Sequence, residues 1–171
     1  LHLQPFELNP DMPPQGEDIV GYMGRKYGLT AEQLAERRAV IRERGAAVGF
    51  DFGPRTHVWN TFDAHRLLHW AGLEGRGREL KRALLAAYHT RGENPGSHEV
   101  LLRLAGEAGL DVGRASDVLD GGEFAVEVRE QERHWQRLGI RSVPSVIVER
   151  RHLIQGGQPV EVFENALREI A

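Results

Sequence analysis

The stretch that decides the fold is GIRSVPSVIVERRHLIQGGQPVEVFENALREIA, residues 139–171. Its apolar run Ser145–Val148 predicts a buried strand, and the charged residues 149–152 predict a tight turn into a second short strand. Pro159 then predicts the start of a final helix. Pro144 stands directly before the first strand, where a proline interrupts the hydrogen-bond ladder, so we expect it to have a specific role.

The beginning of the chain has the pattern of another piece of sheet. Leu1, Leu3, Phe6 and Leu8 follow the alternation of a strand, and Pro5 places the end of that strand near a sheet edge or a bulge. A strand that starts at the first residue needs a neighbour. We therefore expect an upstream segment to pair with it.

Residues 16–122 are almost wholly helical in pattern. Caps and apolar spacing predict six helices: four over residues 18–27, 30–44, 61–71 and 78–89, and two that begin at Ser97 and Asp111. A longer amphipathic helix is expected over residues 123–138. We predict an α/β domain formed by residues 1–15 and 123–171, which an all-helical insertion of residues 16–122 interrupts.

Composition excludes several classes of function. The 171 residues include 22 basic and 25 acidic side chains, a net charge of −3, which argues against general nucleic-acid binding. No apolar run approaches the roughly 18 residues of a membrane span. There is no cysteine, so these residues hold no disulfide, no thiolate nucleophile and no cysteine-bound zinc. No export signal is visible in the first residues, so we expect a cytoplasmic protein.

Five sequence blocks, in order, resemble one known family. They are PFELNPDMP (5–13), NTFDAHRL (60–67), VPSV (143–146), IQGGQP (154–159) and EVF (161–163). Together they resemble the DsbA-family thiol–disulfide oxidoreductases, and within them the FrnE-like branch. The resemblance implies a thioredoxin fold with a helical insertion, incomplete here because its first strand and its Cys-x-x-Cys helix would precede Leu1.

The resemblance also implies a chemistry and a site. A member of this family exchanges disulfides with thiol or disulfide substrates, which we expect to be extended peptides. Val143 and Pro144 are the expected catalytic loop and substrate contact, with a cis bond between them and the Val143 backbone pairing with a substrate strand. No catalytic cysteine can be assigned, because no position in this sequence matches one.

Asn60 and His65 are further candidate substrate-binding residues, since the family's corresponding helix borders the cleft above the active site. A structural alternative remains for each: Asn60 as a helix cap, and His65 as a partly buried surface residue. His65 and His69 have the i, i+4 spacing of zinc ligands, but no glutamate lies between them and no third ligand follows. We therefore predict neither a metal nor a cofactor.

Two other functions stay open. The first is a glutathione-dependent enzyme of the 2-hydroxychromene-2-carboxylate isomerase or kappa-transferase type, which would bind glutathione and place a serine or cysteine before Leu1. The second is a non-catalytic peptide-binding module or chaperone that uses only the proline loop. We expect neither nucleic acid nor membrane as a partner, and the sequence leaves a homodimer open.

Overall fold

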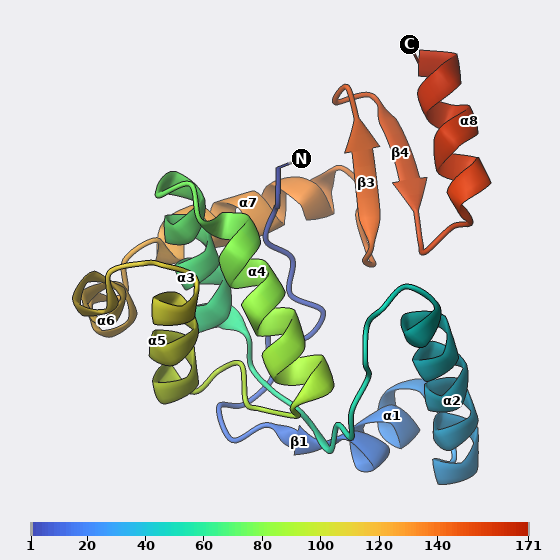
Figure 1. Ribbon diagram of the computed structural model, residues 1–171, viewed down its shortest axis with the longest axis horizontal. Coiled ribbons are helices and arrows are strands. Elements are labelled where there is room, and N and C mark those ends of the chain that lie inside the picture. The colour runs from blue at the N-terminus through green and yellow to red at the C-terminus, as the bar shows by residue number, and fades with distance from the viewer. Residues whose placement is uncertain (1, 171) are drawn as a thin grey trace.

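The computed structural model of the chain describes residues 2–170. Figure 1 shows three groups of elements: α3 to α6 in one group, α1 and α2 at a second corner, and β3, β4 and α8 at a third. The order along the chain is β1 (Glu17–Asp18), α1 (Ile19–Tyr27), α2 (Ala31–Ala47), β2 (His57–Val58), α3 (Phe62–Leu73), α4 (Gly77–Leu85), the π-helical turn η1 (Ala86–Thr90), α5 (His98–Glu107), α6 (Val112–Gly121), α7 (Ala125–Arg137), β3 (Ser145–Val148), β4 (His152–Gln155) and α8 (Val160–Ile170).

Local signals in the sequence fix most helix ends. The Asp18 side chain accepts hydrogen bonds from the first turn of α1, and Gly28 ends that helix with φ 66°. Thr30 and Gln33 form the expected capping box of α2. These predicted ends are confirmed to within a few residues. The predicted helix over 78–89 differs, because α4 ends at Leu85 and continues as the wider turn η1.

The largest core lies among α3 to α6. Leu67, Leu80, Leu101, Leu104 and Val118 are fully buried there. Leu101 and Leu104 confirm the helical spacing expected after Ser97. Burial of each such side chain stabilises the fold by about 1.5–3 kcal/mol, so this helical group supplies a large share of the described core.

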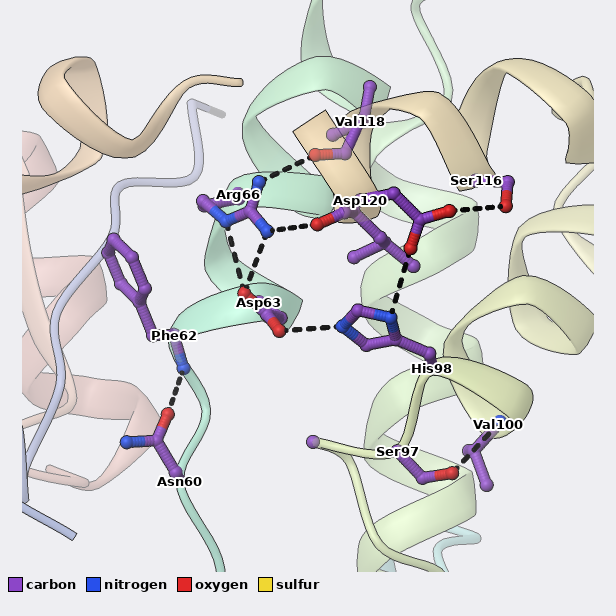
Figure 2. Close-up of polar contacts among 12 residues, drawn as sticks. Asn60, Phe62, Asp63, Arg66, Ser97, His98, Val100, Ser116, Val118 and Asp120 are labelled. Carbon is purple, nitrogen blue, oxygen red and sulfur yellow. Dashed lines mark hydrogen bonds and ion pairs between the residues drawn. The ribbon is translucent and has the colours of Figure 1, made fainter. Parts of the chain in front are cut away.

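Arg66 fastens this core from within (Figure 2). Its buried guanidinium donates hydrogen bonds to the carbonyl oxygens of Val118 at 2.6 Å, Leu119 at 2.8 Å and Glu123 at 3.0 Å. Val118 and Leu119 belong to the last turn of α6, whose carbonyls lack helical partners and carry a partial negative charge. The Asp63 carboxylate, one turn earlier on α3, forms an ion pair with the Arg66 guanidinium, with 2.9 Å between Oδ1 and Nη2. Arg66 therefore caps α6 from α3.

The hairpin β3–β4 has the predicted form. Val146 lies opposite Ile154 and Val148 opposite His152. Three residues, 149–151, join the paired Val148 and His152. Glu149 and Arg150 take φ values of 52° and 59° there, and the Arg151 N–H donates to the Val148 carbonyl at 3.1 Å. The Val143–Pro144 bond is cis, as predicted.

The final helix α8 is less buried than its pattern suggests. None of its described residues is fully buried, and Val162 and Leu167 remain exposed. Ile147 of β3 and Leu153 of β4 are exposed as well. The apolar side chains of β3, β4 and α8 are therefore only partly buried within residues 2–170.

The predicted strand over residues 1–8 is wrong for the described residues 2–8, and Leu1 lies outside the described part. Within residues 2–170, β3 pairs with β4 alone, so this segment has no ladder partner. The burial of its side chains is also the reverse of what the strand pattern predicts: Leu3 and Leu8 are exposed, whereas Pro5 and Glu7 are buried. The segment is held by side chains rather than by a backbone ladder.

Replacing Arg66 tests its role as a cap. Arg66→Met should lower the free energy of unfolding by roughly 3–5 kcal/mol, because it strands Asp63 and three carbonyl groups. Arg103, an exposed arginine paired with Glu107 on α5, supplies the control: Arg103→Met should cost less than about 1 kcal/mol. Chemical denaturation of the two variants measures the difference, and equal losses would contradict the capping role.

Candidate functional site

The loop before β3 presents an unpaired peptide group at Val143. Val143 is 47% exposed. Within the described chain, neither its N–H nor its C=O makes a hydrogen bond. The next carbonyl, of Pro144, accepts a bond from the Gly156 N–H at 2.9 Å, which fixes the loop against the end of β4. The loop thus offers one free donor and one free acceptor beside a rigid anchor.

Asn60 uses both ends of its side-chain amide within the described chain. Its Nδ2 donates to the Met12 carbonyl at 2.7 Å, and its Oδ1 accepts from the Phe62 N–H at 2.9 Å (Figure 2). The second bond pairs the N–H of the first residue of α3 from one position before the cap residue Thr61, which makes no side-chain cap bond of its own. Asn60 therefore joins the loop that follows the N-terminal segment to the start of α3.

His65 lines a cleft of about 640 Å³ between the N-terminal segment and helices α3, α4 and α7. Leu68 on α3, Lys81 on α4 and Gln131 on α7 lie in the same cleft, with residues 2–5 as its other wall. Burial lowers the pKa of His65 to about 4, and the positive charges of Lys81 and Arg129 add to this effect. His65 is therefore a neutral imidazole at physiological pH.

A buried acidic pair lies between the N-terminal segment and α7. Glu7 and Glu132 are both buried, and a single guanidinium, that of Arg129, donates to both. The bond to Glu132 is 2.9 Å long. The second carboxyl oxygen of each glutamate is buried without a partner among the described residues. Arg129 also stacks over the Phe62 ring at 3.8 Å from its centroid, which ties the cluster to α3.

A proton on Glu7 balances the charges of this cluster. The pKa of Glu7 is raised to about 7, first by burial and next by the neighbouring Glu132 carboxyl, against the opposing effect of Arg129. Two carboxylates with one arginine carry a net negative charge in a desolvated place, and a proton on Glu7 removes that charge. It also supplies the donor that the free oxygen of Glu132 lacks.

The structure thus separates the residues proposed from the sequence. His65 faces the cleft beside the N-terminal segment, and Asn60 bonds to Met12, whereas Val143 and Pro144 do not line that cleft and, within residues 2–170, make no hydrogen bond to His65 or Asn60. Sequence reasoning missed Lys81 and the Glu7–Arg129–Glu132 cluster. Glu132 follows the buried Val128 by one helical turn, and this i, i+4 spacing on the inner face of α7 was the available signal.

No helix among the described residues is long and apolar enough to cross a membrane.

The proton on Glu7 predicts a pH dependence of stability. The pKa of Glu7 rises from 4.5 to about 7 on folding. Between these two pH values the folded state therefore binds more protons than the unfolded state. As the pH rises from about 4.5 to about 7, the free energy of unfolding should fall by on the order of 3 kcal/mol. Glu7→Gln mimics the protonated acid and should remove this slope, as measured by denaturation at stepped pH. Glu130→Gln, at an exposed position of α7, should keep the slope; a Glu7→Gln curve parallel to wild type would refute the shared proton.

Comparison with known proteins places the chain in a family. The family model of the DSBA-like thioredoxin domain matches residues 1–168. The chain is similar to the uncharacterized protein YwbO of Bacillus subtilis (strain 168), with 26% identity over 167 residues, 95% of this chain and 78% of that protein. It is also similar to the crystal structure of a probable DsbA oxidoreductase, SCO1869, from Streptomyces coelicolor. That match has a TM-score of 0.89 and 33% identity, over 96% of this chain and 72% of the other.

The helical group, the hairpin after the cis proline and the match over residues 1–168 agree in a single assignment. The fold is α/β and thioredoxin-like, with a large helical part, and the expected resemblance to DsbA proteins is confirmed at the level of the family. The chain belongs to the DSBA-like thioredoxin domain family of thiol–disulfide oxidoreductases.

Proposed function

We propose that this chain is the substrate-holding part of a FrnE-type thiol–disulfide oxidoreductase. In the reaction, a thiolate attacks one sulfur of a disulfide, a new disulfide forms, and the other sulfur leaves as a thiolate. A second thiolate then resolves the mixed disulfide, so two electrons pass between the protein and its substrate. The protein must supply two cysteines and a surface that holds the substrate beside them.

The observation that carries the proposal is the free peptide group of Val143. Val143 is exposed, and its N–H and C=O have no hydrogen-bond partner among residues 2–170; held by the neighbouring Pro144 to Gly156 bond, they can pair with an extended peptide as an added strand. Proline at the next position has no N–H that could compete. We therefore propose Val143 and Pro144 as the substrate contact of the reaction. The thiol or disulfide substrate is then an extended peptide rather than a compact surface.

The dithiol is proposed to come from outside these residues. The 171 residues contain no cysteine. We place a Cys-x-x-Cys before Leu1, where the family resemblance puts the first strand and the redox helix. The domain division predicted from the sequence stays part of this proposal: a thioredoxin-like domain of residues 1–15 and 123–171, with 16–122 as the helical insertion.

His65 and Asn60 take different proposed roles. The two hydrogen bonds of the Asn60 amide favour a positioning role at the start of α3 over direct contact with a substrate. His65 is half-buried and faces the cleft, and we keep it as a ligand contact. The cytoplasmic location and the homodimer stay predictions.

Thiol counting on the protein isolated from its native source tests the dithiol. After reduction, intact mass spectrometry should show two alkylated cysteines, and before reduction none. A lone serine at the aligned position would instead favour the glutathione-dependent enzyme. If the aligned position holds neither cysteine nor serine, the binding module is favoured. Either result, a lone serine or the absence of both residues, would overturn the oxidoreductase proposal.

Turnover gives the second measure. With dithiothreitol as reductant, the protein that carries the cysteine pair should reduce insulin disulfides at least about tenfold faster than the 171-residue chain, which can act only through its binding surface. Replacing both cysteines by serine is the matched control and should abolish the difference. Equal rates for all three proteins would contradict the proposed chemistry.

A further inference from the structure

Lys81 gives the cleft that contains His65 a positively charged lining, and the proposed exchange reaction assigns no role to this charge. Lys81 enters it from α4, half-buried, and within residues 2–170 its ammonium group has no hydrogen bond and no salt bridge. Burial lowers the pKa of Lys81, so the charged form is held there at a cost. An unpaired, partly desolvated cation facing a cleft is a group that an anion would stabilise.

The other charges around the cleft do not neutralise Lys81. Arg78 and Glu79 line the rim from α4, both exposed, and they offset one another. Arg129, which lowers the pKa of His65, does not line the cleft and is paired with Glu7 and Glu132. The net charge of the cleft lining is therefore positive, which agrees with the lowering of the His65 pKa by both Lys81 and Arg129.

His65 adds a hydrogen-bonding group without adding charge. In the described part of the chain, neither of its ring nitrogens has a hydrogen-bond partner. A neutral imidazole presents one donor and one acceptor. It can donate to an oxygen of an anion that Lys81 holds, and an anion so placed would make the imidazolium form easier to reach.

The walls of the cleft suit an organic body beside the charge. Leu68 and Leu73 line it from α3, and Leu3 lines it from the N-terminal segment. Its volume of about 640 Å³ lies within the range of small-molecule sites, roughly 300–1,000 Å³. A ligand that fits would combine a carboxylate with an apolar body.

We propose that this cleft binds a small organic carboxylate, whose acid group contacts Lys81 and His65 and whose apolar body packs against Leu68 and Leu73. This site is separate from the Val143–Pro144 loop and does not depend on the proposed exchange reaction. Binding would join the N-terminal segment to α3 and α4 through one ligand, because residues 2–5 form a wall of the cleft.

Calorimetry with a matched pair of probes tests the charge recognition. 2-Naphthoate carries the acid and the apolar body, whereas 2-naphthalenemethanol carries a similar body without charge. Wild type should bind naphthoate at least about tenfold more tightly than the alcohol. Lys81→Met removes the charge but keeps an unbranched stem, and it should erase this preference. Arg82→Met, at the adjacent exposed position of α4, should bind naphthoate within about twofold of wild type.

Blocking the cleft supplies a test that does not involve charge. Gly72 lines the cleft on α3, and a Cβ added there meets no atom within 4 Å. Gly72→Leu should fill the space and weaken both probes by at least about tenfold, whereas Gly72→Ala should retain binding. Circular dichroism and thermal unfolding would show that both variants fold.

The histidine provides a spectroscopic readout. Naphthoate should raise the pKa of His65, followed by NMR of its ring, and the alcohol should leave it unchanged. The proposal is overturned if wild type does not prefer the acid, if Lys81→Met keeps the preference, or if Gly72→Leu binds as wild type does. None of these results bears on the thiol count, so the two proposals fail independently.

Discussion

The arrangement of the chain depends on the contact of Arg129 with Glu7 and Glu132. The segment of residues 2–8 has no backbone ladder within the described chain, so its position follows from this buried cluster and from the packing of Pro5. Two carboxyls and one guanidinium in a desolvated place are stable only when a proton makes the charges balance. The same segment forms a wall of the His65 cleft, so the cleft depends on this cluster too.

Arginine has a second structural use on α3. Arg66 bonds two carbonyls in the last turn of α6, and Figure 2 shows how Asp63 links Arg66 to His98 at the start of α5. The sequence interpretation had placed the helix that carries Asn60, His65 and Arg66 beside the active site. In the structure Asn60 and Arg66 hold elements together, and His65 alone of the three lines a cleft. The adjacent residues His65 and Arg66 of α3 thus have different roles, because His65 faces the cleft and Arg66 faces the end of α6.

Much of the fold could be predicted because its signals are local. Asp18, Thr30 and Gly28 mark helix ends within four residues of the groups they bond, and the turn at Glu149 and Arg150 follows from its neighbours. The strand over residues 1–8 failed for the opposite reason. Alternation shows that a segment can be a strand, but a ladder needs a partner, and β3 pairs only with β4 in the described chain.

The amino-acid order alone established the helical block, the hairpin after Pro144 and the lack of any thiol in these 171 residues. It could not establish the role of a charged side chain whose partners lie far away along the chain. Arg66 bonds to a carbonyl 52 positions away, and Glu7 bonds to Arg129 122 positions away. Lys81 faces a cleft whose other walls come from distant segments. What a charged side chain does depends on the residues around it in the folded protein, and distant segments supply those residues. Only tertiary packing decides whether a charge is desolvated and whether it has a partner.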